Sequence, residues 1–495
     1  MNWWDLQNGS DIRGVAIDGV KGEAVNLTPE AVLKISYVFS QWLSEGRGKK
    51  VTIAIGRDSR ISGETLLLAA ADGIGKAGHY AYDFGLASTP GMYMALLEKD
   101  LSLDGSIMIT ASHLPFNRNG LKFFTHEGGA TKELIHELLI RAEKMVINYD
   151  LQYFKPIQSI DFMSRYAKRL QSLIIKETGQ NRPFEGSRII VDAGNGAGGF
   201  FVEKVLQPLG ADTSGSLFLD PDGMFPNHVP NPEDKDALQF IQNQVIETKA
   251  DLGIIFDTDV DRAALIDHQG KAINRNKLIA LISAILLEKN DKRYIVTDSV
   301  TSEGLTEFIH ERGGYHHRFK RGYKNVIDEG IRLNKIGKTS DLAIETSGHA
   351  AFRDNHFLDD GAYLTVQLLI AFAKQKKKNH LLTDYISNLK EPKEEKEIRL
   401  SLPSHDFKIY GGDVINKLKE WVPSVENWHI VEPNYEGIRV SCQSMTEQGW
   451  FLMRLSLHDP MLALNIESNV TGGCEKIEAK IMAWLQQFSD INRTL

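Results

Sequence analysis

The chain has 495 residues, of which 42% are hydrophobic and 25% are charged. This composition is typical of a folded globular protein and excludes a disordered or fibrous chain, while the length predicts roughly three to four domains. The formal net charge is −8 at pH 7, so the chain lacks the cationic excess with which proteins neutralise nucleic-acid phosphates. We therefore expect no nucleic-acid partner.

The cysteines and the N-terminus bear on the cellular compartment. Cys442 and Cys474 are the two cysteines, and their spacing fits neither a disulfide framework nor a zinc site. The first residues lack the basic region and apolar run of a secretion signal. No segment reaches the roughly 18 uninterrupted apolar residues of a membrane helix. We expect a cytoplasmic protein with reduced thiols and no membrane partner.

Short β-branched runs, each followed by a polar loop and an amphipathic stretch, predict α/β units along most of the chain. The predicted strands are 50–56, 106–111, 188–192, 251–256, 294–298 and 341–346, and a helix is predicted at 64–77. Ligands of open α/β sheets bind beyond the carboxyl ends of the strands. The polar residues that directly follow these strands are therefore the candidates for chemistry.

The pattern changes in the last quarter of the chain. The charged segment 374–396 predicts a helix end and a linker, and its lysine run is interpreted as a solvated helix terminus, with an anion-binding patch as the alternative. Strands at 449–457 and 462–467 and a helix near 475–488 then predict an α+β region. Two softer domain boundaries are expected near 149–159 and after Gly270.

Three aspartates, Asp257, Asp259 and Asp261, follow an apolar strand. Carboxylates at every second position can fold around one cation, and hard oxygen ligands select Mg²⁺ or Ca²⁺. A calcium hand would need glycine at its sixth position and glutamate at its twelfth, where the chain has Arg262 and His268, so that motif is excluded. The remaining interpretations are a magnesium site, completed by water or a phosphate oxygen, and a set of turn-forming aspartates.

Ser112 lies just beyond another predicted strand, in a turn-rich loop with His113 beside it and Lys122 further on. An exposed hydroxyl with groups for proton transfer and charge neutralisation nearby is what a phosphate-carrying serine requires. A lone Ser-His pair, however, is also common in ordinary loops.

Four further loops carry weaker patterns. The segment 345–349 offers a carboxylate and a hydroxyl that could face a ligand, 321–324 offers glycine with cations, and 454–460 offers an arginine fork that can hold phosphate. Each is also compatible with a simple turn. The glycine-rich loop 194–199 matches neither nucleotide-binding pattern, so we interpret it as close backbone packing and expect no nucleotide.

Taken in order, these segments resemble the α-D-phosphohexomutase family, and its phosphomannomutase/phosphoglucomutase branch best. The matching motifs are 10–14, 56–63, 110–113 with Lys122, Asp257 to Arg262, Gly322 with Lys324, and Glu345 with Ser347 and His349. Ile344 replaces the leading glycine of the last of these motifs. The family's terminal phosphate loop is matched by Arg454, Ser456 and Pro460, but Leu457 and His458 replace its glycine and threonine. We therefore expect altered phosphate clamping there.

The resemblance implies three related α/β domains and a smaller α+β C-terminal domain around a central cleft, with expected bounds of 1–157, 158–272, 273–392 and 393–495. It implies an enzyme that interconverts hexose 1-phosphate and hexose 6-phosphate through phosphoserine 112 and a hexose 1,6-bisphosphate. Glucose 1,6-bisphosphate is the activator implied. The expected assembly is a monomer or homodimer.

The resemblance also assigns residue roles. Mg²⁺ would be held by a phosphoserine oxygen of Ser112 and by Asp257, Asp259 and Asp261. The implied residues for charge stabilisation and acid–base work are Arg13, His113, Lys122 and Arg262. The implied substrate-binding residues are Gly322, Lys324, Glu345, Ser347, His349, Arg454, Ser456 and His458.

Two alternatives remain open at this point. A phosphoglucosamine mutase would share the serine and metal loops and differ mainly in the sugar loop, where Thr346 is compatible with glucose or mannose. A catalytically silent sugar-phosphate-binding protein would be expected to lack Ser112 or a metal aspartate, and all of these residues are present.

Overall fold

The computed structural model describes residues 2–147, 158–403, 406–456 and 459–493. The chain forms two compact units, Met1–Leu278 with Ser347–Thr383 and Ile279–Thr346 with Asp384–Leu495. The expected division into four domains stays a prediction. The boundary expected near 149–159 falls mostly outside the described residues.

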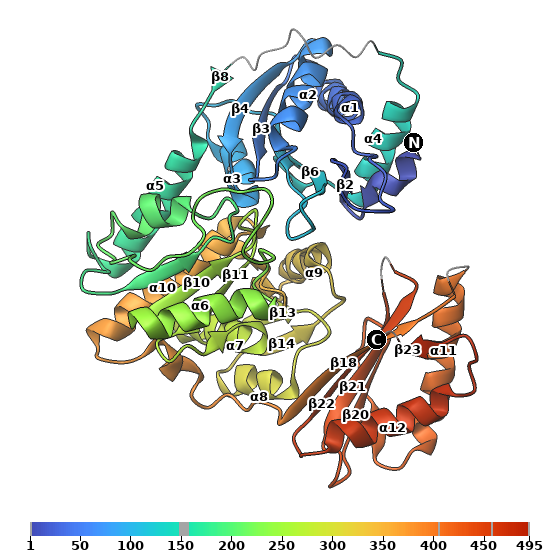
Figure 1. Ribbon diagram of the computed structural model, residues 1–495. Helices are drawn as coiled ribbons and strands as arrows, with labels where there is room; N and C mark the ends of the chain where they lie inside the picture. The colour runs from blue at the N-terminus through green and yellow to red at the C-terminus, as the bar shows by residue number, and fades with distance from the viewer. Residues whose placement is uncertain (1, 148–157, 404–405, 457–458, 494–495) are drawn as a thin grey trace. The chain divides into compact units, whose positions relative to one another are not determined.

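The first unit begins with a mixed sheet in the order β1-β2-β6-β5-β3-β4-β8, with β7 beside β6 (Figure 1). Its strands are β1 (Gln7–Asn8), β2 (Asp11–Val15), β3 (Thr52–Arg57), β4 (Tyr80–Leu86), β5 (Gly105–Ile109), β6 (Arg118–Thr125), β7 (Gly128–Gly129) and β8 (Gln158–Ser159). Strand β3 runs parallel to β4 and β5, whereas β6 runs antiparallel to β2 and β5. The strands predicted at 50–56 and 106–111 are confirmed as β3 and β5.

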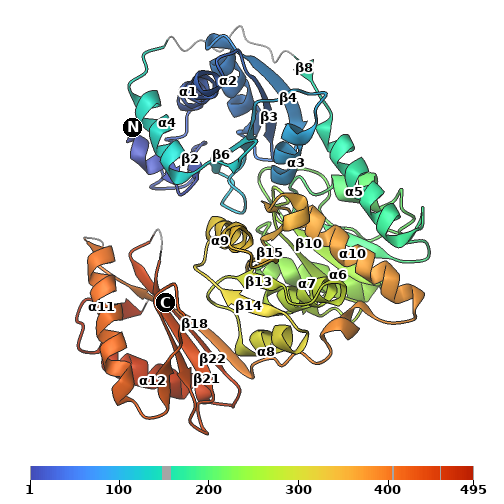
Figure 2. The ribbon, with the colours of Figure 1, turned by 180° about the vertical axis from the view of Figure 1, so that it is seen from behind.

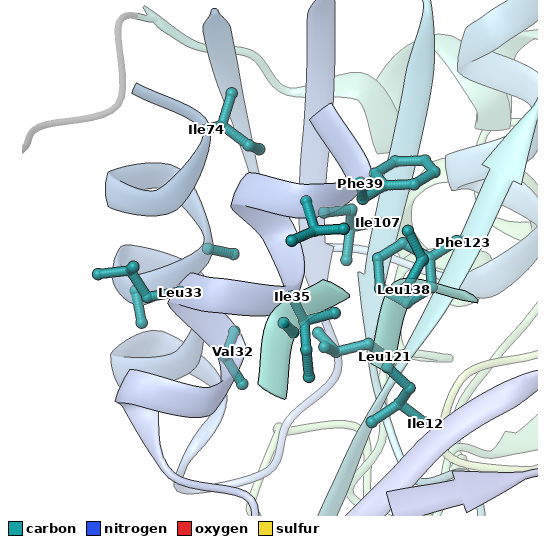
Figure 3. Close-up of a cluster of buried hydrophobic side chains, with 14 of the residues drawn as sticks. Ile12, Val32, Leu33, Ile35, Phe39, Ile74, Ile107, Leu121, Phe123 and Leu138 are labelled. Carbon is teal, nitrogen blue, oxygen red and sulfur yellow. The ribbon is translucent and has the colours of Figure 1, made fainter. Parts of the chain in front are cut away.

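Helices cover this sheet and build its core. They are α1 (Pro29–Arg47), α2 (Gly63–Lys76), α3 (Thr89–Met94) and α4 (Lys132–Glu143). Helix α1 begins at the cap Thr28, whose side chain accepts the Ala31 amide, and ends at Gly48 in a left-handed conformation. Figure 3 shows Ile35 and Phe39 of α1 beside residues of the sheet in one buried cluster. Burying each such side chain contributes about 1.5–3 kcal/mol.

A second sheet of the first unit has the order β12-β11-β10-β9. The elements of this region are α5 (Phe162–Thr178), β9 (Ile189–Asp192), α6 (Lys235–Thr248), β10 (Leu252–Phe256), β11 (Ala263–Asp267), β12 (Ala272–Ile273), β16 (Ala350–Phe352), β17 (Leu358–Asp359) and α10 (Gly361–Lys377). Strands β10 and β11 are antiparallel neighbours, so the aspartates fill the tight connection between them. In the glycine-rich loop, a Cβ on Gly196 would lie 2.7 Å from the Thr258 carbonyl oxygen. This confirms close backbone packing in that loop.

The second unit contains three parallel strands, in the order β14-β13-β15, and a separate antiparallel sheet in the order β19-β20-β21-β22-β18-β23 (Figure 2). The elements are α7 (Arg275–Lys289), β13 (Tyr294–Thr297), α8 (Glu303–Glu311), β14 (Tyr315–Arg318), α9 (Tyr323–Lys335), β15 (Ser340–Ile344), β18 (Glu394–Ser401), α11 (Phe407–Trp421), β19 (Trp428–Ile430), β20 (Ile438–Cys442), β21 (Gly449–Leu455), β22 (Met461–Ser468), α12 (Gly473–Leu485) and β23 (Asn492–Arg493). Helices α11 and α12 share one buried core with the antiparallel sheet. The predicted fold class, α/β units followed by an α+β region, is confirmed.

Both cysteine thiols are buried and neither forms a disulfide, as the reduced state requires. Within the described ranges, no helix is both long enough and apolar enough to cross a membrane.

Candidate active site

Ser112 sits in a constrained turn just beyond β5. Its φ angle is +51°, a left-handed conformation that is uncommon for a residue other than glycine. Its amide donates to Thr110 Oγ1 at 2.8 Å, and its Oγ donates to Asp257 Oδ2 at 3.0 Å. The residue is 4% exposed, so the expectation of an exposed hydroxyl was wrong. The turn folds Ser112 inward, toward the aspartates.

Asp257, Asp259 and Asp261 form a buried carboxylate cluster in the β10–β11 connection. One oxygen of each lies within 4.8 Å of the others. Asp259 Oδ1 and Asp261 Oδ1 are buried and have no hydrogen-bond partner among the residues that the structure describes. Buried carboxylate oxygens without partners are costly, and an all-oxygen donor set suits a hard cation. The three aspartates therefore fit a Mg²⁺ ion.

Lys122 extends from β6 to the other oxygens of the cluster. Its Nζ lies 2.9 Å from Asp259 Oδ2 and 2.6 Å from Asp261 Oδ2. Burial alone would disfavour the charged amine, but the two carboxylates outweigh it and hold the pKa of Lys122 well above its ordinary value. Burial likewise opposes ionisation of Asp261, yet Lys122 keeps the pKa of that carboxyl low. Lys122 is therefore a fixed positive charge.

Arg262 links the carboxylate cluster to the serine loop. Its Nε donates to Asp257 Oδ2 at 3.1 Å, and its Nη2 donates to Ser112 Oγ at 3.2 Å and to His113 Nδ1 at 2.8 Å. Burial, followed by the charge of Arg262, lowers the pKa of His113 to about 3. His113 is therefore neutral, and its Nδ1 is an acceptor.

Arg13 reaches the same loop from β2. Its Nη1 donates to the Ala111 carbonyl oxygen at 3.1 Å, while its Nη2 pairs with Asp11 at 3.1 Å. The structure thus gathers every residue predicted for catalysis or metal binding into one cluster of the first unit. These residues are Arg13, Ser112, His113, Lys122, Asp257, Asp259, Asp261 and Arg262.

Ser347 and His349 also belong to the first unit. Ser347 Oγ and His349 Nδ1 are 2.9 Å apart, and His349 Nε2 lies 3.8 Å from Asp261 Oδ1. Burial lowers the pKa of His349 to about 3, although Asp261 opposes the shift. The sequence associated His349 with substrate binding, and its contact with the aspartate cluster was not predicted.

The other predicted substrate-binding residues that the structure describes lie in the second unit. The Gly322 amide, which precedes α9, donates to Glu345 Oε1 at 2.7 Å, and Lys324 Nζ pairs with Asp328 at 3.1 Å. The glycine has a φ of +115°, where a side chain would be strained.

The terminal phosphate loop is only partly described. Arg454 is the penultimate residue of β21, is 9% exposed and lies 3.8 Å from Glu436. Burial lowers its pKa, and Glu436 opposes that shift. Ser456 Oγ accepts the Asp459 amide at 3.2 Å. His458, the third predicted residue of this loop, lies outside the described residues.

Sequence reasoning missed two residues that support the site. Thr89, at the start of α3, donates its hydroxyl to Asp259 Oδ2 at 2.5 Å and its amide to the Asp259 carbonyl at 2.9 Å. Its sequence signal, a serine cap followed by Thr-Pro, indicates only the start of a helix. Arg60 lies in the segment 56–63, which was matched as a motif but given no role.

An α/β fold with a strand-end serine beside a carboxylate cluster, Arg262 and Lys122 has the parts of a phosphoryl-transfer site. Such sites rely on positioned charges and a metal ion rather than on elaborate covalent chemistry.

Comparisons with known proteins agree with this class. Family models for phosphoglucomutase/phosphomannomutase alpha/beta/alpha domains I, II and III match residues 6–144, 164–270 and 274–388. A phosphomannomutase/phosphoglucomutase of Pseudomonas syringae pv. tomato is 28% identical over 478 residues, covering 96% of this chain and 94% of the relative. A phosphoglucosamine mutase of Cronobacter sakazakii is 31% identical over 379 residues, covering 75% and 80%.

A solved structure points the same way. A phosphoglucomutase/phosphomannomutase family protein from Burkholderia thailandensis superimposes with a TM-score of 0.79 at 25% identity, and the match covers 99% of each chain. The chain belongs to the phosphoglucomutase/phosphomannomutase family of α-D-phosphohexomutases.

Proposed function

We propose that this chain interconverts hexose 1-phosphate and hexose 6-phosphate through a phosphorylated Ser112. The observation that carries the proposal is the placement of Ser112 Oγ, which lies 3.0 Å from Asp257 Oδ2 and 3.2 Å from Arg262 Nη2. A phosphoryl group on this oxygen would face both the carboxylate cluster and a cation. Family membership and the names of the relatives support the same reaction.

The reaction proceeds in two transfers. In the first, the bond between phosphorus and Ser112 Oγ breaks as a bond forms to a free sugar hydroxyl, and the hydroxyl proton passes to Ser112 Oγ. This gives a hexose 1,6-bisphosphate and a free serine. In the second, the other phosphoryl group of this bisphosphate returns to Ser112 Oγ, the serine proton passes to the departing sugar oxygen, and the isomeric monophosphate is released. The bisphosphate also serves as the activator that first phosphorylates Ser112.

The charged residues have distinct parts in these transfers. Arg262 touches Ser112 Oγ and stabilises the negative charge that builds on the moving phosphoryl group. Lys122, whose pKa is raised by two carboxylates, stays protonated and supplies charge rather than accepting a proton. His113 is neutral, with Nδ1 occupied by Arg262, so it helps to orient that guanidinium.

Mg²⁺ is the ion that we propose for the carboxylate cluster. Asp259 and Asp261 would each offer the oxygen that lacks a hydrogen bond, and Asp257 would offer a third. When bound, the ion would add positive charge beside a phosphoserine oxygen.

The substrate loops are assigned by their chemistry. Glu345 accepts hydrogen bonds from sugar hydroxyls, and the Ser347 hydroxyl donates hydrogen bonds to them. The distal phosphate is anchored by Arg454, Ser456 and His458. Gly322 and Lys324 also contribute to substrate binding. The cytoplasmic compartment and the monomeric or dimeric state stay predictions from the sequence.

The test is turnover by the purified protein with Mg²⁺ and a trace of glucose 1,6-bisphosphate. Glucose 1-phosphate, mannose 1-phosphate and glucosamine 1-phosphate would be compared, with Ser112→Ala as the variant and the exposed Ser102→Ala as its matched control. Turnover that Ser112→Ala abolishes and Ser102→Ala retains is the expected result.

The sugar that turns over fastest separates the candidate activities. Glucose or mannose 1-phosphate identifies the phosphomannomutase/phosphoglucomutase activity. Preference for glucosamine 1-phosphate identifies the second candidate, which the similarity to a phosphoglucosamine mutase favours. Absence of turnover with every sugar, despite binding, leaves a silent sugar-phosphate-binding protein and contradicts the proposal.

A further inference from the structure

The guanidinium of Arg60 is enclosed by the loop that carries Ser112. Arg60 is 1% exposed, and its Nη1 donates to the carbonyl oxygens of Pro115 and Arg118 at 2.7 and 2.9 Å. Its Nη2 donates to the carbonyl oxygens of Ser112 and Leu114, each at 2.5 Å. One side chain therefore binds four carbonyl groups within seven consecutive residues.

Arg60 is also held by two residues outside the serine loop. Its Nε lies 3.3 Å from Asp58 Oδ2, and its own amide donates to Asp58 Oδ1 at 2.9 Å. Both side chains of this ion pair are fully buried. The Phe225 ring lies 5.1 Å from the guanidinium carbon, within the range of a cation–π contact. These contacts with Asp58 and Phe225 therefore hold the guanidinium independently of its contacts with the serine loop.

The contacts converge on the residue whose conformation is least favourable. Ser112 has a φ of +51°, and such a backbone persists only where its surroundings over-determine it. Arg60 holds the Ser112 carbonyl, while Thr110 Oγ1 accepts the Ser112 amide at 2.8 Å. Both polar backbone groups of the serine are therefore held, the carbonyl by Arg60 and the amide by Thr110.

We infer that Arg60 is a positioning residue for phosphoryl transfer, which it serves by holding Ser112 Oγ in line with Asp257 and Arg262. The inference rests on the proposed function. Arg60 donates to backbone carbonyl oxygens of the loop, whereas the Ser112 hydroxyl is contacted by Arg262, so Arg60 acts through the loop. Because a planar guanidinium presents five donors in a fixed fork, lysine would retain the charge but could not bridge the four carbonyls.

The consequence is kinetic. A displacement of about 1 Å at a reacting group can lower a rate by roughly 100-fold. A loosened Ser112 loop should therefore slow the chemical step and leave the binding of substrate largely unchanged. A buried arginine that served only folding would instead lower the fraction of competent molecules.

The experiment compares wild type, Arg60→Lys and the matched control Arg182→Lys, whose side chain is 56% exposed. Each protein is phosphorylated with glucose 1,6-bisphosphate, and intact mass gives the phosphorylated fraction. The phosphoenzyme is then mixed with the sugar 1-phosphate that wild type prefers, and the single-turnover rate constant is measured. We expect Arg60→Lys to reach the full phosphorylated fraction with a rate constant lowered roughly 10- to 100-fold, KM nearly unchanged, and Arg182→Lys equal to wild type.

Other outcomes separate the competing explanations. A lower phosphorylated fraction with a normal rate constant, or no change at all, overturns the positioning role. If Arg60→Lys does not fold, Thr110→Val tests the same restraint at the Ser112 amide, and a wild-type rate constant there also overturns it. Inactive wild type would contradict the proposed function itself, whereas active wild type with an equally fast Arg60→Lys contradicts only this inference.

Discussion

The two carboxylate oxygens of Asp259 have different surroundings, and this indicates different roles. Its Oδ2 accepts Thr89 Oγ1 and Lys122 Nζ, at 2.5 and 2.9 Å, while its Oδ1 is buried without a hydrogen bond from any described residue. The bonded oxygen fixes the direction of the side chain, and the other oxygen remains available to a cation. Partners of this kind orient metal ligands in the manner of an outer shell.

Replacing Asp259 with asparagine should therefore abolish metal binding while the protein still folds. The amide keeps one acceptor but loses the charge that a hard cation requires, so we expect a fall in activity of at least about 100-fold. Mg²⁺ should raise the melting temperature of wild type, since a ligand of the native state stabilises it, and should leave that of Asp259→Asn unchanged. Asp220→Asn, at an exposed aspartate, is the control. An equal Mg²⁺ effect on both variants would contradict the assignment.

Glu467, in β22, gives the stability of the second unit a dependence on pH. It is 7% exposed, and burial raises its pKa to about 7, against the Trp450 Nε1 hydrogen bond at 2.8 Å and the charge of Arg439. Glu395 adds to the rise and Arg318 opposes it. Between the ordinary value of 4.5 and about 7, the folded protein holds a proton that the unfolded chain has released. The free energy of unfolding should therefore decrease as pH rises through this window.

Glu467→Gln keeps an acceptor for Trp450 but cannot ionise, so it should flatten that dependence. We expect the free energy of unfolding of this variant to equal that of wild type near pH 4 and to exceed it at pH 8 by up to about 3 kcal/mol. Urea unfolding at several pH values measures the difference, with the exposed Glu475→Gln as the control. Parallel pH curves for wild type and Glu467→Gln would show that Glu467 is not the group responsible.

The residues that could be predicted from sequence are those whose signal is local. Ser112 and the three aspartates follow apolar strands at fixed spacing, and this pattern was sufficient to select them. Arg60 and Thr89 were missed because their partners are distant in sequence: Arg60 binds carbonyls more than 50 residues away, and Thr89 binds an aspartate 170 residues away. The spacing of residues along the chain does not reveal contacts between such distant positions.

At the level of elements, the strands that end in functional loops were predictable, whereas β6 was not. The segment between Ser112 and Lys122 was predicted to be a turn-rich loop, and it contains Asn119-Gly120, a dipeptide that is a strong turn signal. In the structure Gly120 lies inside β6, where a Cβ would stand 2.3 Å from the Ile12 carbonyl oxygen and 2.7 Å from that of Thr110. The glycine permits β6 to approach β2 and the residue that follows β5 closely, and only the tertiary fold reveals this.

The packing of α1 on α2 depends on a second close approach, at Gly73. A Cβ there would lie 2.2 Å from the Leu33 carbonyl oxygen of α1. Gly73→Ala should therefore force the helices apart and lower the free energy of unfolding by about 1–3 kcal/mol.

Gly46, in α1, provides the matched control, because a Cβ there meets nothing within 4 Å. Gly46→Ala should raise the free energy of unfolding by up to about 1 kcal/mol, since alanine favours a helix over glycine. Urea unfolding of both variants distinguishes steric contact from helix propensity. The same sign for the two changes would contradict the steric explanation.

At the scale of the whole molecule, the antiparallel sheet of the second unit makes buried contacts on both of its faces. Ile438 and Val440 of β20 face the core that α11 and α12 share with the sheet, and Arg439 between them points to the opposite face. There Trp450 and Leu452 pack with Val300 in a small apolar cluster. The sequence predicted the α+β character of the region, but the partner of the second face comes from a segment over 130 residues earlier.

Arg439 is the polar centre of that contact. Its guanidinium lies 3.6 Å from the Trp450 ring centroid, and it donates to the carbonyl oxygens of Ser299 and Thr301 at 2.9 and 3.0 Å and to Glu303 at 2.9 Å. The side chain therefore connects the sheet to the segment that precedes α8. Removing it leaves buried carbonyls without donors and a tryptophan without its cation.

Arg439→Ala should consequently weaken the cooperativity of the second unit. We expect a loss of about 3 kcal/mol and an additional calorimetric transition at lower temperature, in which residues 393–495 unfold first. Hydrogen exchange would locate that transition, because the amides of β20 to β22 should lose protection before those of β13. Arg399→Ala, on β18 with its side chain 62% exposed, should leave one transition. If Arg439→Ala also unfolds in one step at the wild-type temperature, the apolar contact of Val300 with Trp450 and Leu452 is sufficient to join the two parts.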